Sequence, residues 1–141
     1  MFVQDRESAR RFFFDVWRKY KARIPLEPME GLVSGVILQH PEYHGFLENE
    51  GDAMVREFSP DMGMTNPFLH MGMHISIREQ LGSDRPQGIS AIYQRLLPKF
   101  TSPHDLEHRM MDCLGEVLWS AQRDHKLPDE SAYMDCLGKS D

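Results

Sequence analysis

Histidines are the residues of this sequence whose number and spacing most plainly suggest chemistry. A random scatter of seven histidines over 141 positions would give roughly 0.3 pairs separated by four residues. Six of the seven instead form three such pairs: His40/His44, His70/His74 and His104/His108. Residues four apart on a helix are neighbours, and neutral imidazole is the commonest protein ligand for transition metals. The pattern therefore predicts a metal site.

The predicted site draws its ligands from several helices and includes one carboxylate. Glu107 falls on the apolar side of its predicted helix, where a carboxylate is unfavourable unless a cation compensates it. Pro41 interrupts the helix after His40, so His44 is expected on a separate turn. We expect His40, the other two histidine pairs and Glu107 to reach one common centre. The candidate metal ligands are His40, His44, His70, His74, His104, Glu107 and His108.

The donor set limits the metal, but it leaves a purely structural alternative open. Imidazoles and one carboxylate, without an inward cysteine pair, suit a divalent Zn, Fe or Mn ion. The alternative is a set of core histidines that hydrogen-bond to backbone or carboxylate groups. For Glu107, the alternative is a buried pair with an arginine or a histidine. His125 stands outside the pairs and is not expected to bind metal.

The sequence does not identify a reaction. The segment His104-Asp105-Leu106-Glu107-His108 matches the H-x-x-E-H pattern of inverted zinc peptidases, in which a glutamate activates water. That class carries the motif in a much larger catalytic domain, and no further ligand stands out here, so peptidase activity is not favoured. The E-x-x-H pairs of di-iron bundles and the common nucleotide-binding and hydrolase motifs are absent. If the chain has a catalytic residue, Glu107 is the candidate.

Composition narrows the class of protein. A net charge of −6 opposes general nucleic-acid binding, which needs cations to neutralise phosphates. No apolar run approaches about 18 residues, and the first residues lack an apolar signal segment, so we expect a cytoplasmic protein without a membrane partner. Cys113 and Cys136 have no C-x-x-C spacing, and we expect reduced thiols that fill core positions.

Apolar periodicity predicts an all-α fold, a single domain over residues 1–141 with five or six helices and no sheet. Asn66-Pro67 and Ser102-Pro103 each place a capping residue before a proline, which marks the starts of two helices that carry histidine pairs. These helices should end near residues 81 and 125. Further helices are expected over residues 5–23, from 28 toward 40, over 87–100 and near 128–138, with a partly ordered connection over 45–65.

Short segments along most of the chain resemble a known family. They are Asn66-Pro67-Phe68-Leu69-His70 with His74, Arg78-Glu79-Gln80, Asp84-Arg85-Pro86, Gly88-Ile89, Glu107-His108 and Ala121-Gln122-Arg123. With these segments, the sequence resembles the bacterial family catalogued as domain of unknown function eighteen-forty-one. The resemblance covers nearly the entire chain. It implies a small, stand-alone helical bacterial protein and transfers no activity.

A helical adaptor is the other functional class that the sequence leaves open. The first helix carries a basic stripe that could meet an acidic partner, although such a run is commonly only a solvated face. The stripe consists of Arg10, Arg11, Arg18, Lys19 and Lys21. The sequence names no protein partner and no oligomeric state.

Overall fold

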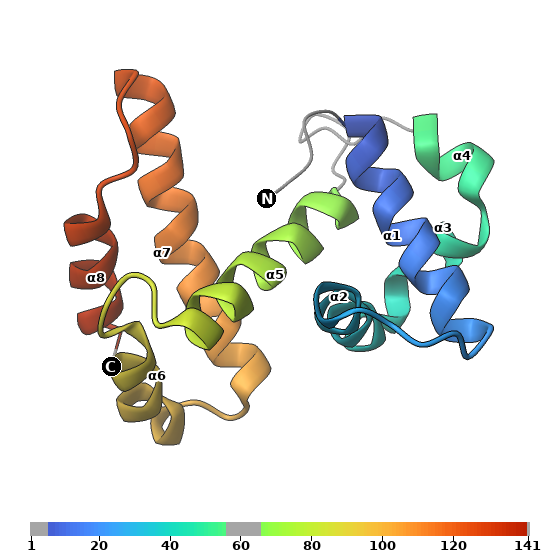
Figure 1. The fold of residues 1–141 in the computed structure, drawn as a ribbon. Helices are drawn as coiled ribbons and strands as arrows, with labels where there is room; N and C mark the ends of the chain where they lie inside the picture. Colours follow the sequence, from blue (N-terminus) through green and yellow to red (C-terminus); the bar gives the residue numbers. More distant parts are fainter. Residues whose placement is uncertain (1–5, 56–65, 141) are drawn as a thin grey trace. The chain divides into compact units, whose positions relative to one another are not determined.

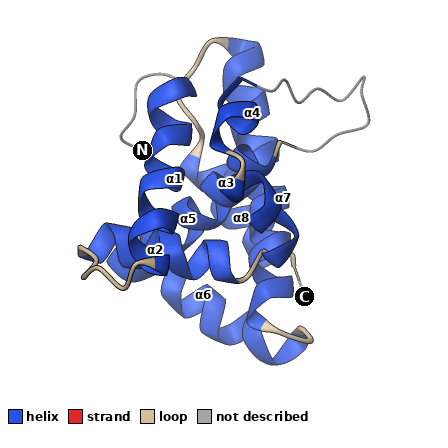
Figure 2. Cartoon of the chain, turned by 90° about the vertical axis from the view of Figure 1, so that its right-hand side faces the viewer, coloured by secondary structure: helices blue, strands red, loops and turns tan. Residues whose placement is uncertain are grey.

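The computed structural model describes residues 6–55 and 66–140, and every regular element in these ranges is helical (Figure 1, Figure 2). The prediction of an all-α fold is confirmed. Eight α-helices lie in the described ranges, more than the five or six expected, because part of the predicted connection is itself helical. No helix among the described residues is long and apolar enough to cross a membrane.

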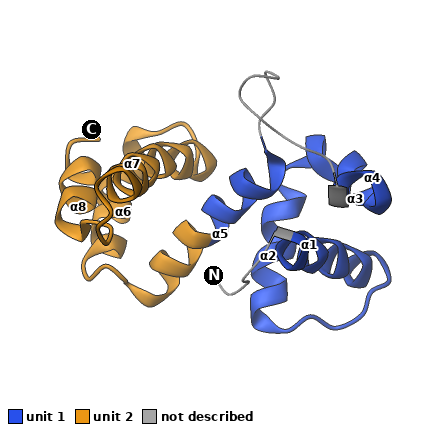
Figure 3. Ribbon diagram, turned by 90° about the horizontal axis from the view of Figure 1, so that it is seen from above, with its two compact units in different colours: residues 1–75 blue, residues 76–141 orange. Residues whose placement is uncertain are grey.

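The chain divides into two compact units, residues 1–75 and residues 76–141 (Figure 3). The division falls inside helix α5 (Pro67–Ser83), which therefore contributes residues to both units. The expected single domain over residues 1–141 stays a prediction.

The first unit packs short helices around the N-terminal helix. Its elements are α1 (Arg6–Lys21), α2 (Pro28–Leu38), the 3-10 helix η1 (Pro41–Tyr43), α3 (His44–Glu48) and α4 (Glu50–Val55), followed by the first part of α5. Helices α3 and α4 occupy residues that were expected to form a partly ordered connection. The rest of that predicted connection, residues 56–65, lies outside the described residues.

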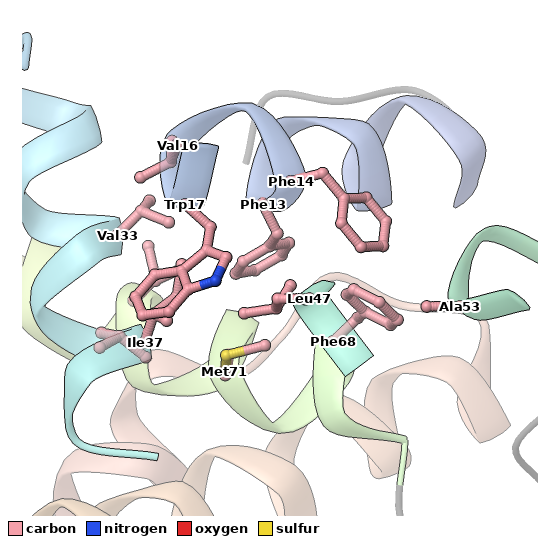
Figure 4. Close-up of a cluster of buried hydrophobic side chains, with 12 residues drawn as sticks. Phe13, Phe14, Val16, Trp17, Val33, Ile37, Leu47, Ala53, Phe68 and Met71 are labelled. Atoms are coloured by element: carbon pink, nitrogen blue, oxygen red, sulfur yellow. The ribbon is translucent and has the colours of Figure 1, made fainter. Parts of the chain in front are cut away.

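Aromatic side chains of α1 form the centre of the first unit's core (Figure 4). Phe13 and Phe14 lie against Phe68 of α5, with ring centroids 5.8 and 5.9 Å apart. Val33 and Ile37 of α2 are fully buried in the same cluster. The helix predicted over residues 5–23 is thus confirmed as α1, and its apolar face holds α2 and the start of α5 together.

Arg10 departs from the basic stripe predicted for α1. Its side chain is buried, Nη1 donates to the Ala53 carbonyl at 2.9 Å, and the guanidinium lies 4.8 Å from the Phe68 ring centroid. A guanidinium is weakly hydrated and stacks well on aromatic faces, so it tolerates this position better than an ammonium would. The expectation that Arg10 faces solvent was therefore wrong.

The two helices that carry histidine pairs begin as predicted. Asn66 Oδ1 accepts the backbone N–H groups of Phe68 and Leu69 at 2.9 and 3.2 Å, which caps α5. Ser102 Oγ accepts the N–H of Asp105 at 3.1 Å at the start of α7 (Pro103–Asp124). These caps fix where the helical repeat begins, and so they fix which face each histidine occupies.

The second unit is built around α7. Besides the end of α5, it contains α6 (Ile89–Leu96), the 3-10 helix η3 (Leu97–Lys99), α7 and α8 (Glu130–Gly138). Helix α8 packs along α7, with Leu137 buried, and the Tyr133 hydroxyl donates to Gln80 Oε1 at 2.6 Å. Helix α6 begins two residues later than predicted because Gly88, at φ +95°, takes a left-handed conformation suited to glycine.

A disulfide between Cys113 of α7 and Cys136 of α8 corrects the expectation of two reduced thiols. The Cα atoms lie 5.7 Å apart, within the range that a disulfide spans. The sequence did not reveal the bond because the two residues meet only when α8 docks on α7. Closing a loop of this length stabilises a fold by about 3 kcal/mol in the chain-entropy model.

Candidate metal centre

His40 lies where α2 gives way to η1, and its ring is held in one orientation. The side chain is 1% exposed, and Nδ1 lies 2.8 Å from the Val36 carbonyl oxygen. A carbonyl only accepts, so Nδ1 carries the proton and, in the neutral ring, Nε2 carries the lone pair. Metal-binding histidines are commonly fixed in this way by a hydrogen bond from the other ring nitrogen.

His70 and His74 lie one turn apart on α5, and both face His40. The His40 ring centroid is 5.1 Å from that of His70 and 4.7 Å from that of His74. The ligand nitrogens offered by His40 and His74 lie within 4.8 Å of each other. We call these three residues the His40 cluster. His74 is fully buried, and His70 is half-buried.

Two ring nitrogens of the His40 cluster lie close together. Nε2 of His70 and Nε2 of His74 are 3.3 Å apart. Two imidazole nitrogens bound tetrahedrally to one zinc ion at about 2.05 Å would be separated by about 3.4 Å. The same distance also suits a long hydrogen bond in which one Nε2 carries a proton. The geometry therefore accommodates both of the interpretations that the sequence left open.

Tyr43 covers the His40 cluster and was not anticipated from the sequence. Its ring stacks on that of His40 with centroids 5.4 Å apart and planes 7° from parallel, and it meets His70 edge-on at 6.1 Å. Burial, followed by the charge of Glu42, raises the pKa of the Tyr43 hydroxyl. The only signal in the sequence was its place in the turn that Pro41 starts, which brings the ring back over His40.

His44 points to a different neighbour. Its ring lies 4.4 Å from that of Trp17 in α1, and Nε2 donates to the Ile37 carbonyl at 2.9 Å. The spacing of four between His40 and His44 therefore does not produce a helical pair, because η1 separates the two residues. The role of His44 as a ligand stays a prediction, and its contacts do not favour it.

A second pair lies in the first turns of α7. The rings of His104 and His108 are half-buried, with centroids 4.3 Å apart and planes at 67°. The ligand nitrogens that they offer lie within 4.8 Å of each other, close enough for both to bind one ion. The cap at Ser102 places them one helical turn apart, as the spacing predicted.

Glu107 is buried beside the second pair, and its carboxylate has an arginine partner. Its side chain is 8% exposed, and Arg78 Nε of α5 donates to Oε1 at 3.3 Å. The inward position is confirmed, and the ion pair is the alternative that the sequence left open. Arg78 was missed as the partner of Glu107. It lies four residues after His74 along α5, as His74 lies four residues after His70. Whether Glu107 also binds metal stays a prediction.

Comparisons with known proteins identify a family but no characterised relative. The family model described as Domain of unknown function (DUF1841) matches residues 5–139. No curated protein and no solved structure matches the chain. Any activity must therefore be argued from the geometry of the histidines and their neighbours.

Proposed function

The chain belongs to the family of unknown function DUF1841, and we propose that it binds a divalent transition metal ion through its paired histidines. The observation that carries the proposal is the 3.3 Å separation of Nε2 in His70 and His74, with the His40 ring centroid 5.1 and 4.7 Å from the centroids of those two rings. Three imidazoles from two elements converge there. Three protein ligands with one open position are typical of catalytic zinc sites.

The tautomer of His40 supports this proposal independently of the distances. Its Nδ1–H is held by the Val36 carbonyl, which directs the Nε2 lone pair away from α2. A metal ligand needs a deprotonated nitrogen in a fixed position, and this hydrogen bond supplies both. An imidazole donor set is compatible with Zn, Fe and, less well, Mn, so the identity of the ion stays a prediction.

We further propose that His104 and His108 bind a divalent ion, beside the Glu107 carboxylate that Arg78 contacts. That this ion is shared with the His40 cluster, as the histidine count predicted, stays a prediction. In this proposal Arg78 neutralises and orients the carboxylate beside the ligands.

The adaptor alternative receives less support, because acidic neighbours already occupy the basic stripe of α1. Lys19 and Lys21 contact Glu30 and Glu48 at 2.7 and 2.6 Å, and Arg18 contacts Asp15 at 2.9 Å. The hydrogen bond from Lys19 lowers the pKa of the Glu30 carboxyl, which keeps it charged. A partner would therefore have to displace ion pairs inside the first unit.

Metal analysis of the untagged protein, purified without chelator, tests the proposal. Wild-type protein should carry a stoichiometric transition metal, and replacing His70 and His74 together with Ala should remove it. His125→Ala is the matched control, because His125 ends α7 in an exposed left-handed position outside both groups. Replacing the half-buried His70 alone with Gln should weaken binding while keeping the helix intact.

Two results would overturn the proposal. The first is wild-type protein without bound metal that also takes up none of added Zn, Fe or Mn. The second is a folded double variant that retains the full metal equivalent. Either result would leave the His40 cluster as a hydrogen-bonded structural group. A variant of His104 and His108 tests their contribution separately: loss of the same single equivalent supports one shared ion.

A further inference from the structure

The disulfide of the second unit has one buried and one reachable sulfur. Cys113 is fully buried, whereas Cys136 is half-buried and lines an open cavity of about 330 Å³. Val117, Ala121, Leu127 and Ala132 form the apolar part of the cavity wall. A small molecule that enters this cavity therefore meets the sulfur of Cys136 and not that of Cys113.

The polar groups of the cavity wall are mainly acidic. Glu116, Asp124 and Asp129 line it together with one cation, Lys126. Glu116 Oε2 lies 3.9 Å from the sulfur of Cys136, so one of these carboxylates stands directly beside the reachable atom. A cationic or neutral molecule is therefore better suited to this cavity than an anion.

Two further polar side chains, Arg109 and Ser140, lie close to the disulfide. Arg109 Nη2 lies 3.9 Å from the sulfur of Cys136, and Arg109 Nε donates to Ser140 Oγ at 3.0 Å. Ser140 Oγ in turn lies 3.9 Å from the sulfur of Cys113. Burial alone opposes a thiolate at Cys113, and the Ser140 hydroxyl, which Arg109 holds by a hydrogen bond, offsets that effect.

We propose that the Cys113–Cys136 disulfide is a thiol-exchange site, at which a small aminothiol attacks Cys136. The attacking thiolate forms a bond to the sulfur of Cys136, the bond to Cys113 breaks, and its electron pair leaves on the sulfur of Cys113. A second thiolate attacks the mixed disulfide, which releases a small disulfide and the thiolate of Cys136. Two thiols are oxidised, the protein disulfide is reduced, and protons lost by the attackers balance those taken up by the cysteines.

This site is independent of the proposed metal function. Glu116 and Cys136 lie outside the histidine groups, and the exchange step uses no metal. The two proposals can therefore fail separately. Thiol exchange can fail in a protein that binds metal, and metal binding can fail in a protein whose disulfide exchanges with thiols. Ser140 lies beside the leaving sulfur of Cys113 and stabilises it, and Arg109 holds the Ser140 hydroxyl in position.

The direction of attack can be trapped in the wild-type chain. Oxidised protein is treated briefly with cysteamine, quenched with acid and N-ethylmaleimide, and mapped by peptide mass spectrometry. We expect cysteamine on Cys136 and maleimide on Cys113 in at least about tenfold excess over the opposite arrangement, because only one sulfur is reachable. Equal amounts, an excess on Cys113, or a disulfide that resists cysteamine would each overturn the proposal.

The charge of the cavity supplies a second readout that does not disturb the disulfide. Reduction rates with cysteamine and with 3-mercaptopropionate, both corrected for thiolate fraction, should favour the cationic thiol. Glu116→Gln should lower that preference about threefold at low ionic strength, because it removes the nearest carboxylate. Glu130→Gln, on the same helix as Cys136 but outside the cavity wall, should leave it unchanged. An unchanged preference in Glu116→Gln would overturn the assignment of the cavity as the thiol-binding site.

Discussion

At single positions, residue type and spacing predicted the candidate ligands. The path of the backbone then decides which of these side chains face one another. His40 and His44 are four apart, like the other pairs, yet one faces His70 and His74 and the other packs on Trp17. A spacing of four places two side chains on one face only if the helix is continuous. The prolyl residue between them starts a 3-10 turn, which redirects the second ring.

Glu107 also shows what helical periodicity can and cannot predict. Its place on the apolar side of α7 could be predicted from periodicity alone, and the structure buries it. Its partner Arg78 could not be predicted, because the contact joins residues of two different helices that are 29 positions apart in the chain. Periodicity describes one helix at a time, whereas a buried charge is compensated by whichever helix packs against it.

Replacing Glu107 tests whether its main role is the ion pair. Glu107→Gln should lower the free energy of unfolding by about 1–3 kcal/mol, since it leaves the guanidinium of Arg78 without its anion. Adding Arg78→Met to this variant should recover part of that loss. Urea denaturation of the metal-loaded proteins measures both effects. A stability loss in Glu107→Gln that disappears in chelator would instead identify Glu107 as a metal ligand.

At the scale of helices, local signals predicted more than signals that depend on packing. The cap at Asn66 and the cap at Ser102 involve side chains and backbone within three residues, so the sequence contains the whole interaction. Helices α3 and α4 are short and lack such signals, and they were missed. The disulfide depends on the docking of α8 against α7, so cysteine spacing alone led to the wrong expectation.

The cap of α5 should contribute measurably to stability. Asn66→Ala removes the acceptor of two backbone N–H groups and should destabilise the fold by about 1 kcal/mol. For a chain of this size, that corresponds to a fall of roughly 2–5 °C in melting temperature. Asn66→Asp is the matched control, because aspartate caps equally well. Equal melting temperatures for wild type and Asn66→Ala would show that the cap is energetically neutral.

At the scale of the whole molecule, the proposed metal links folding to pH and to chelation. An ion bound only by the folded chain stabilises it by mass action, by about 2.7 kcal/mol at a hundredfold excess over the dissociation constant. Chelator should therefore lower the melting temperature of wild-type protein by several degrees. The His70→Ala/His74→Ala variant should melt at the same temperature with and without chelator.

Acidification should act on the same linkage. Metal binds neutral imidazole, so its contribution to stability is present above the histidine titration range, near pH 6.5, and is lost as the pH falls through it. Metal content and melting temperature measured together across pH 8 to 5 should decline in parallel. If the melting temperature falls while the metal stays bound, loss of metal from the histidines is not the cause of the acid destabilisation.

The position of the boundary between the two compact units affects any attempt to express them as separate fragments. It falls after residue 75, within a helix, so cutting the chain there would leave residues 67–75 of α5 on one fragment and residues 76–83 on the other. Helical segments this short are marginal in water by themselves. The cut would also divide His74 from Arg78. Fragment expression, the usual route to assigning a property to one half of a chain, would therefore damage both halves, whereas point variants in the intact chain would not.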